Sequence, residues 1–270
     1  MPVAYVTGAA GGLGRAITEG LLNAGYRVAM FDISQEALDR ASGELGEGVS
    51  AHAMNVTDRA SVDAAVTEAE KALPPCDLLI NNAGTFSVCA PMWECDPDRW
   101  FRDIDVNLKG TFLMCNRVAG GMVDRGAGRI VNIVSSGGVL DGHPYGTSYA
   151  ASKTGVTRIT EGLSMELQPH GVTAFCIGPP AVNTAMTQWL INDEQAKTHR
   201  PLIKEIFEKG EDFPPQVVAD CVLALASGRA DKLTGRYFLP HKDYESIIAD
   251  ADRIVADDQW VLRIAGHKKG

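Results

Sequence analysis

The chain has 270 residues, of which 45% are hydrophobic and 22% are charged; these values are ordinary for a globular protein with a sizeable core. Its formal net charge of −9 argues against nucleic-acid or anionic-membrane partners, because both need clustered Lys and Arg. No apolar stretch approaches the roughly 18–20 residues of a membrane-spanning helix, and the first residues leave no room for a signal peptide. We therefore expect a cytoplasmic protein, with a short solvated basic end at residues 267–269.

The cysteines carry neither the C-x-x-C spacing nor the neighbouring His that metal sites use. Reduced thiols and no metal site are expected. Cys89 and Cys95 are close enough in sequence to be weighed as a pair, but two free thiols are favoured.

Short β-branched runs alternate with longer amphipathic segments along most of the chain. The predicted strands are Val3–Thr7, Arg27–Phe31, Val49–Asn55, Asp77–Ile80, Arg129–Val134, Val172–Ile177 and Arg236–Leu239. The predicted helices are Leu13–Ala24, Ser34–Glu44, Asp58–Leu73, Asp98–Asp124, Ser148–Gln168 and Pro215–Ser227. This alternation predicts βαβ units in an α/β fold, a doubly wound parallel sheet of about seven strands with helices on both faces. No linker interrupts residues 1–240, so we expect a single domain there.

Two segments depart from this alternation. Residues 185–213 are irregular and carry Trp189, Phe207 and Phe213, so they predict a helical insertion or lid within the domain. Residues 241–270 predict a helical tail. Its part from Asp243 to Ile264 has too much apolar surface to be solvated, so we expect it to pack on the same domain or on a neighbouring subunit.

The first predicted strand runs directly into a glycine-rich segment, Thr7–Gly14, which a helical pattern follows. Such a turn lets backbone N–H groups approach a pyrophosphate at the positive end of the helix. A glycine cluster alone is weak evidence, but its place between strand and helix predicts the dinucleotide site of a Rossmann-type fold. The residues expected to form it are Gly8, Gly11, Gly12, Leu13 and Gly14.

Asp32 indicates which dinucleotide is bound. It follows the second strand and lies 18 residues after Gly14, close to the spacing of about 20 for the acid that binds the adenosine ribose. A carboxylate accepts hydrogen bonds from a ribose 2′-hydroxyl and repels a 2′-phosphate. Because the adjacent Ile33 brings no positive charge, NAD is favoured over NADP. The alternative is that Asp32 only caps the next helix, a role that Ser34 fills equally well.

Tyr149 and Lys153 are four residues apart in a predicted helix, so they share one face. A nearby ammonium stabilises a tyrosinate, which predicts a lowered phenol pKa and a proton donor for a developing alkoxide. Alone, this spacing is common and carries little information.

Several motifs together resemble the short-chain dehydrogenase/reductase family, in the subgroup with the T-G-x-x-x-G-x-G loop. The resemblance spans roughly residues 1–240, and the order of the motifs is more specific than any one of them. The matching positions are Thr7–Gly14, Asn81-Asn82-Ala83-Gly84, Asn107, Ser136, Tyr149 and Lys153.

The resemblance implies a role for each matching residue. Tyr149 is implied as general acid and base, and Lys153 as the group that holds the nicotinamide ribose and lowers the Tyr149 pKa. Ser136 is implied to hydrogen-bond the substrate oxygen, with Ser135 as the alternative, and Asn107 to bind a water that links Lys153 to solvent. A satisfied polar side chain is the alternative for Asn107. The cofactor's adenosine side is implied to pass Asn82, Ala83 and Gly84.

Two positions depart from the family pattern. Asn55, followed by Val56, stands where the family more often has Asp beside the adenine, and its amide can still bond the adenine amino group. Pro179-Pro180 replaces the usual Pro-Gly, and proline has no N–H and a fixed φ. Pro179, Val182 and Thr184 match the family's nicotinamide contacts. With Pro180 in place of glycine, either the loop does not need a left-handed residue here or its path differs from that of the family.

The expected activity is hydride transfer between NAD and a mainly apolar secondary alcohol or ketone. Its site is expected to be lined by Gly137–Tyr145, Thr85–Val88 and Met186–Leu190, with a solvent-facing loop histidine favoured for His143 over a substrate contact. By resemblance we also expect a homo-oligomer, a tetramer or dimer. The alternatives are a 3-oxoacyl-carrier-protein reductase, a sugar-nucleotide epimerase or dehydratase, and a non-catalytic NAD-binding protein.

Overall fold

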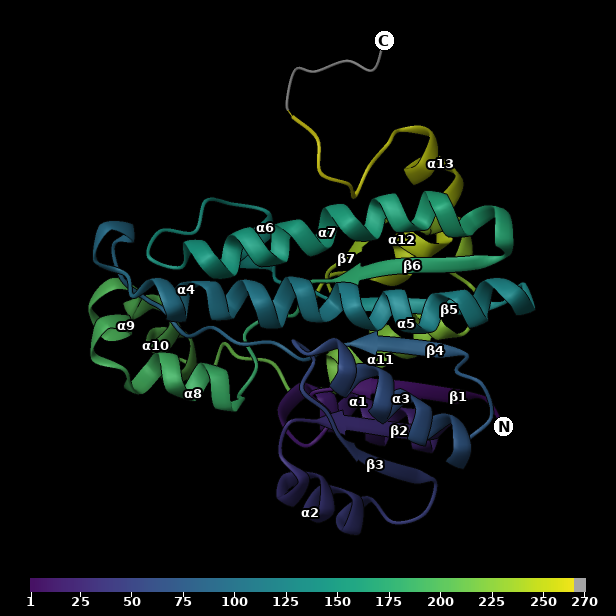
Figure 1. Cartoon of the computed structure of the whole chain (residues 1–270). Helices are drawn as coiled ribbons and strands as arrows, with labels where there is room; N and C mark the ends of the chain where they lie inside the picture. The colour runs from purple at the N-terminus through teal and green to yellow at the C-terminus, as the bar shows by residue number, and fades with distance from the viewer. Residues whose placement is uncertain (265–270) are drawn as a thin grey trace.

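Seven parallel strands form one sheet in the order β3-β2-β1-β4-β5-β6-β7 in the computed structural model, which describes residues 1–264 (Figure 1). The strands are β1 (Val3–Thr7), β2 (Arg27–Asp32), β3 (Val49–Ala53), β4 (Leu78–Asn81), β5 (Gly128–Ile133), β6 (Val172–Ile177) and β7 (Tyr237–Phe238). The doubly wound α/β fold expected from the sequence is confirmed. The order reverses direction between β1 and β4, which is where open α/β sheets bind their ligands.

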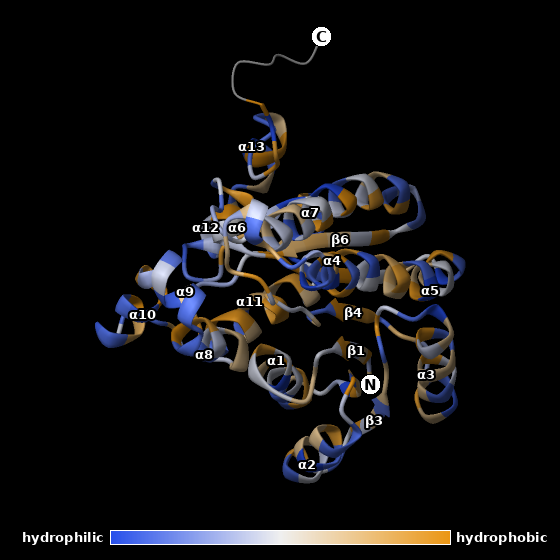
Figure 2. Cartoon of the chain, turned by 60° about the vertical axis from the view of Figure 1, so that its left-hand side comes forward, coloured by the Kyte–Doolittle hydropathy of each residue, from blue (hydrophilic) through white to orange (hydrophobic). Residues whose placement is uncertain are grey.

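Helices cover both faces of the sheet. The principal ones are α1 (Gly12–Asn23), α2 (Gln35–Leu45), α3 (Arg59–Ala72), α5 (Gly110–Arg125), α7 (Thr147–Leu167) and α11 (Gln216–Ala226). Side chains alternate along β1, so that Ala4 and Val6 join one apolar cluster with α1 and α11, whereas Val3 and Tyr5 join another with α3 and α5. The strands β1 and β4 are accordingly coloured mainly hydrophobic between the helix layers in Figure 2.

The predicted strand and helix ends agree with the structure to within one or two residues, apart from one segment. The single helix expected over 98–124 is α4 (Pro97–Ile104), a π-helix (Asp105–Lys109) and α5 in succession. Amphipathic spacing does not distinguish this succession from one continuous α-helix, because the π turn adds one residue without breaking the helix. Such π-bulges occur frequently at functional sites, and this one contains Asn107.

The irregular segment at 185–213 folds into α8 (Ala185–Asn192), α9 (Glu194–His199) and α10 (Pro201–Glu208). We call residues 185–213 the lid. Its base is closed by a bridge between Val182 and Phe213, where the Phe213 N–H donates to the Ala181 carbonyl at 2.9 Å. Figure 1 shows the three helices beside the ends toward which the strands run. The lid therefore lies at the carboxyl edge of the sheet.

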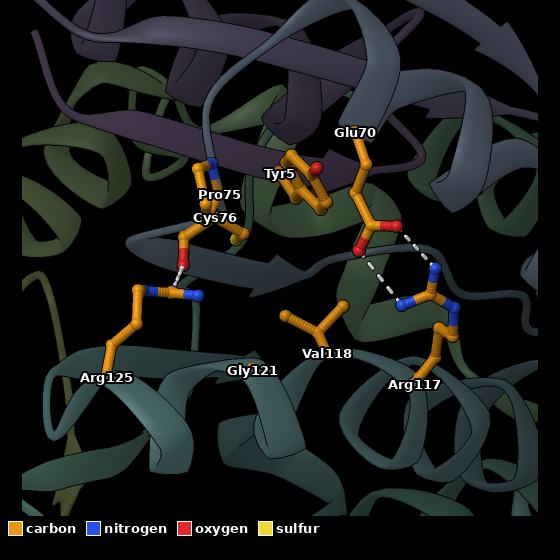
Figure 3. Close-up of a pocket in the computed structure, with 8 residues that line it drawn as sticks. All are labelled: Tyr5, Glu70, Pro75, Cys76, Arg117, Val118, Gly121 and Arg125. Atoms are coloured by element: carbon orange, nitrogen blue, oxygen red, sulfur yellow. Dashed lines mark hydrogen bonds and ion pairs between the residues drawn. The ribbon is translucent and has the colours of Figure 1, made fainter.

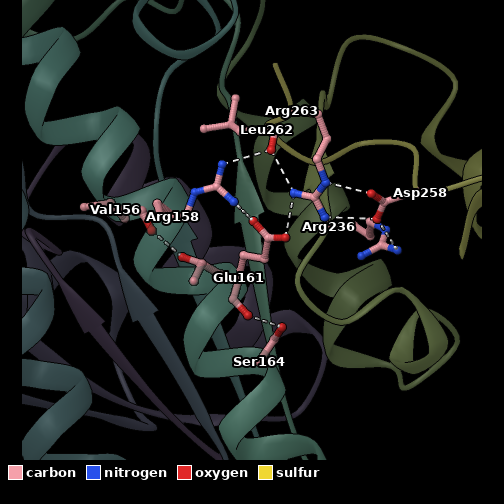
Figure 4. Close-up of polar contacts among 9 residues, drawn as sticks. Val156, Arg158, Glu161, Ser164, Arg236, Asp258, Leu262 and Arg263 are labelled. Carbon is pink, nitrogen blue, oxygen red and sulfur yellow. Dashed lines mark hydrogen bonds and ion pairs between the residues drawn. The ribbon is translucent and has the colours of Figure 1, made fainter. Parts of the chain in front are cut away.

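The C-terminal segment packs on its own chain. Ile247 and Ile254, from α12 (Tyr244–Ala249) and α13 (Ala251–Ala256), are buried in the cluster of α1 and α11. Residues 257–264, after α13, are not helical. Arg263 reaches Glu161 of α7 at 2.7 Å, and the Leu262 carbonyl accepts from Arg158 at 2.9 Å (Figure 4). The basic end at 267–269 lies outside the described residues. Within residues 1–264, no helix is long and apolar enough to cross a bilayer.

Candidate active site

A glycine turn joins β1 to α1. Gly8 and Gly12 have positive φ, +64° and +51°, which other residues rarely adopt. A Cβ on Gly14 would lie 2.0 Å from the Gly8 carbonyl oxygen, so only glycine allows the helix to pack this close to the turn. A Cβ on Gly11 would meet nothing within 4 Å. The turn is thus open at Gly11, where the first N–H groups of α1, including that of Leu13, lack helical partners.

The glycine turn is tied to the end of β4. The Thr7 hydroxyl accepts hydrogen bonds from the N–H groups of Asn82 and Ala83, both at 3.0 Å. The Asn82 amide donates in return to the carbonyls of Thr7 and Gly8, at 3.0 and 3.1 Å. The Asn82 side chain therefore holds the turn in shape. Thr7 was not singled out as a site residue from the sequence.

Asp32, at the end of β2, lies beside the same turn. Its Oδ2 accepts from the Ala10 N–H at 3.1 Å and its Oδ1 from the Ile33 N–H at 2.8 Å. Ser34 caps α2, because its hydroxyl accepts from the Ala37 N–H at 3.2 Å. The alternative in which Asp32 caps this helix is wrong, so the carboxylate is left beside the turn for another partner.

A cavity of about 340 Å³ opens beyond β2 and β3. Its lining combines Ile33, Asn55 and Thr57 with Asp98, Phe101, Arg102, Asp105 and Val106 from α4 and the π-helix. The side-chain amide oxygen of Asn55, Oδ1, already accepts from the Thr57 N–H and hydroxyl, at 3.0 and 2.9 Å. Val56 packs against Gly110, at which a Cβ would lie 2.8 Å from the Val56 side chain. The structure thus places Asn55, but not Val56, in the lining of this cavity, and the Asn55 Oδ1 is turned to the protein.

A second cavity, of about 280 Å³, is formed by residues from other parts of the chain (Figure 3). Its lining is Tyr5, Glu70, Pro75, Cys76, Arg117, Val118, Gly121 and Arg125. Arg117 pairs with Glu70 at 2.6 Å, and Arg125 donates to the Cys76 carbonyl at 2.5 Å. Pro75 and Cys76 precede β4, at the amino edge of the sheet, and no predicted site residue lines this cavity.

Tyr149 and Lys153 lie together in the first turns of α7. The Lys153 ammonium is 5.8 Å from the centre of the Tyr149 ring and donates to the Ile133 carbonyl at 2.9 Å. Burial lowers the pKa of Lys153 to about 8. Burial raises the pKa of Tyr149, whereas a hydrogen bond with the Ser135 side chain and the charge of Arg200 oppose this rise. The lowered Tyr149 pKa predicted from Lys153 is therefore not found, because burial outweighs the Ser135 hydrogen bond and the charge of Arg200.

Two consecutive serines follow β5, and they face different partners. The Ser135 side chain bonds the Tyr149 hydroxyl. The Ser136 hydroxyl donates to the Pro179 carbonyl at 3.4 Å, toward the predicted nicotinamide loop. The family spacing favours Ser136, but Ser135 is the serine in contact with Tyr149. The assignment of Ser136 to the substrate oxygen stays a prediction.

Asn107 connects the π-helix to the reaction centre. Its amide donates to the Thr85 carbonyl at 2.9 Å and the Ser152 hydroxyl at 3.0 Å, and its oxygen accepts from the Thr85 N–H at 2.8 Å. A Cβ on Gly84 would lie 3.1 Å from the Asn107 oxygen and 3.2 Å from the Lys153 nitrogen. The side chains of Asn107 and Lys153 thus both lie beside Gly84, and the water-binding role implied for Asn107 stays a prediction.

Asp103 is a buried acid that the sequence analysis missed. Its carboxylate accepts from the Ser87 N–H at 2.9 Å, the Ser87 hydroxyl at 2.6 Å and the Ser148 hydroxyl at 2.6 Å. Burial raises its pKa, and its charge raises the pKa values of Tyr149 and Lys153. The available signal was its i, i+4 spacing from Asn107, which places both polar side chains on one face of the helix predicted over 98–124.

The loop from 178 to 184 contains no residue with positive φ. Pro180 therefore fits the path without strain, and the left-handed glycine of the family pattern is not needed. Val182 is buried, and Thr184 caps α8 by accepting from the Thr187 N–H at 3.3 Å. The Thr184 methyl would lie 3.2 Å from a Cβ on Gly12. The loop that holds the predicted nicotinamide contacts, Pro179, Val182 and Thr184, thus touches Ser136 at one end and the glycine turn at the other.

Aromatic rings surround Tyr149 on the lid side. Phe86 stacks on Tyr149 with ring centres 4.7 Å apart, and His143 and Trp189 lie 5.8 and 6.2 Å from Phe86. Arg200 completes the group, with its guanidinium 5.8 Å from the Phe86 ring centre. The three segments expected to line the substrate site therefore meet. Arg200 was missed, because a lone arginine in an irregular segment has no diagnostic spacing.

The family model described as short chain dehydrogenase matches residues 2–195. A 2-dehydro-3-deoxy-L-rhamnonate dehydrogenase (NAD(+)) of Sphingomonas sp. (strain SKA58) is 39% identical over 177 residues, which cover 65% of this chain and 70% of that protein. A 3-oxoacyl-[acyl-carrier-protein] reductase of Vibrio harveyi is 35% identical, covering 86% of this chain and 93% of that protein.

Solved structures agree with these sequence matches. An actinorhodin polyketide ketoreductase variant with NADPH matches with a TM-score of 0.79 and 31% identity, covering 88% of this chain and 95% of that chain. Together with the fold and the arrangement of Tyr149, Lys153 and the glycine turn, the matches show that the chain belongs to the short-chain dehydrogenase/reductase family of oxidoreductases.

Proposed function

We propose that the protein is an NAD(H)-dependent dehydrogenase that interconverts a secondary alcohol and its ketone. The observation that carries this proposal is the convergence of Tyr149 and Lys153 with Asn107 beside a glycine turn of cofactor-binding shape. These groups come from distant parts of the chain, and a protein that only bound the cofactor would not need a proton donor among them.

The residues at the carboxyl edge fit a nicotinamide dinucleotide, because Gly11 is open where a pyrophosphate approaches and Asp32 lies beside the same turn. When bound, the nicotinamide supplies or accepts the hydride. Tyr149 then donates the proton from its hydroxyl as the carbonyl becomes an alcohol, and takes a proton in the reverse direction. The hydroxyls of Ser135 and Ser136 orient the substrate oxygen, and Lys153 supplies positive charge beside the phenol.

NAD is proposed rather than NADP because of Asp32. One matched relative is named for NAD(+) and one matched structure contains NADPH, so the family alone does not decide the cofactor. A carboxylate beside the glycine turn repels a 2′-phosphate. The test is to measure the dissociation constants of NADH and NADPH for the purified protein. Tighter NADPH binding would refute the choice.

The strongest competing function is reduction of 3-oxoacyl groups on a carrier protein, to which the Vibrio harveyi relative points. An acidic carrier needs basic docking surface, and the net charge of −9 disfavours it. Assays with a 3-oxoacyl carrier and with free ketones would discriminate between the two. A marked preference for the carrier substrate would support the competing function.

We also propose that the protein acts as a homo-oligomer in the cytoplasm, with a dimer or tetramer formed through α5 and α7. Phe112 of α5 and Met165 of α7 are 51% and 63% exposed, so each of the two helices carries an apolar side chain that a neighbouring subunit would cover. Light scattering on the purified protein tests this. A monomer at micromolar concentration would contradict it.

A further inference from the structure

Arg200, between α9 and α10 in the lid, is a half-buried arginine without an acidic partner among the described residues. Its Nε is buried with no hydrogen bond, and its Nη1 donates only to the Pro144 carbonyl at 3.4 Å. Arg129, which is also partly buried, pairs with Asp231 at 2.6 Å. Because an unsatisfied buried donor is costly, the Nε–Nη2 edge of Arg200 calls for an explanation.

Arg200 lies close to the reaction centre. Its guanidinium is 5.8 Å from the Phe86 ring, which stacks on Tyr149. Its charge also lowers the pKa values of Tyr149 and His143. The Arg200 guanidinium thus belongs to the group of side chains around Tyr149.

His143 has an unpaired hydrogen-bond acceptor, which complements the unpaired donor of Arg200. Its Nδ1 lies 2.8 Å from the Gly137 carbonyl, so Nδ1 carries the hydrogen and Nε2 is an acceptor in the neutral ring. Nε2 is buried and has no partner among the described residues. Burial and the Arg200 charge lower the His143 pKa, which favours this neutral form. The solvent-facing role favoured from the sequence is therefore wrong for Nε2.

We propose that the substrate is a hydroxy or oxo carboxylic acid, with its carboxylate bound by the Nε–Nη2 edge of Arg200 and one hydroxyl donating to His143 Nε2. This rests on the proposed dehydrogenase function and names its substrate class. A planar carboxylate matches two parallel donors of a guanidinium. The expectation of a mainly apolar alcohol does not account for either unpaired atom.

The test compares aldonates with alditols of the same chain, which differ at one end by a carboxylate in place of a hydroxymethyl group. Gluconate with glucitol and galactonate with galactitol are suitable probes, assayed by NADH formation. The variants are Arg200→Met and Lys204→Met, which removes an equal charge from an exposed position of α10. Calorimetric titration of each probe adds a readout that needs no turnover.

We expect kcat/KM to be at least tenfold higher for the aldonates in the unmodified protein. Arg200→Met should lower that value by about 10- to 150-fold, as expected for loss of hydrogen bonds to a charged group, and lower alditol turnover by a clearly smaller factor, because the alditol has no carboxylate for Arg200 to bind. Lys204→Met should change neither. Preference for the alditols, or an equal loss for both probe classes in Arg200→Met, would overturn the proposal.

Binding separates this proposal from the proposed function. Aldonate binding that depends on Arg200, without turnover of any probe, would support the anion site and count against the dehydrogenase. Turnover of the alditols with no aldonate binding would leave the dehydrogenase standing and refute the anion site. A sugar phosphate bound more tightly than the aldonates would assign Arg200 to a phosphate and refute the carboxylate.

Discussion

The Asp103 carboxylate accepts a 2.6 Å hydrogen bond from the hydroxyl of Ser148, the residue that precedes Tyr149. The other carboxylate oxygen holds Ser87, just beyond Phe86. One buried acid on α4 therefore joins the start of α7 to the loop whose aromatic ring stacks on Tyr149. The position of the proton donor depends on this contact.

Replacing Asp103 should destabilise the fold in proportion to the bonds lost. Asp103→Leu leaves the Ser87 and Ser148 groups without their acceptor, and should lower the free energy of unfolding by about 3 kcal/mol. Asp103→Asn keeps one acceptor oxygen and should cost about 1 kcal/mol. Urea denaturation measures both. Equal stability of Asp103→Leu and the unmodified protein would show that the network does not stabilise the fold.

Two glycines of the turn should respond differently to alanine. Gly14→Ala places a Cβ 2.0 Å from the Gly8 carbonyl, so it should lower stability by about 1–3 kcal/mol and abolish NADH binding. Gly11 has an extended backbone and open space around it. Gly11→Ala should keep stability within about 0.5 kcal/mol and weaken NADH binding alone. Thermal unfolding and NADH titration test the pair, and unchanged NADH affinity in Gly11→Ala would contradict the cofactor site.

Asp32 should set the cofactor preference. Asp32→Ala removes an acceptor for the ribose 2′-hydroxyl and the repulsion of a 2′-phosphate, so the ratio of NADH to NADPH affinity should fall by about 10- to 150-fold. Ser34→Ala, which removes the cap of α2, should lower stability and leave that ratio unchanged. The measurement is fluorescence titration with both cofactors. An unaltered ratio in Asp32→Ala would exclude Asp32 as the selecting group.

The pH dependence should identify which serine supports the tyrosinate. Burial raises the Tyr149 pKa, and alcohol oxidation needs the deprotonated phenol, so kcat/KM for oxidation should rise with pH from neutral into the alkaline range. The Ser135 hydrogen bond opposes the raised pKa. Ser135→Ala should therefore move the profile to higher pH, whereas Ser136→Ala should lower the rate without moving it. A profile unmoved by Ser135→Ala would remove Ser135 from this role.

The sequence predicts the sheet and the cofactor edge well, because both depend on local patterns. A buried strand such as β1 shows in a short apolar run of residues. The spacing of Gly14 and Asp32 lies within one strand-helix-strand unit of the sequence. The π turn at Asn107 and the burial of Asp103 are not visible in this way, since two polar residues at i, i+4 spacing are common on the exposed face of an ordinary amphipathic helix. Arg200 is the clearest case: only the folded lid brings it near Tyr149 and shows that it has no acidic partner within residues 1–264.

The central claim is that Tyr149 transfers the proton in an NAD-linked reaction. Its most direct test is the rate of NADH formation from aldonates and alditols by the unmodified protein and by Tyr149→Phe, with NADH affinity measured on both. We predict turnover that falls by about 10²- to 10⁴-fold in Tyr149→Phe, with NADH affinity within a factor of about two. Undiminished turnover by Tyr149→Phe would contradict the account.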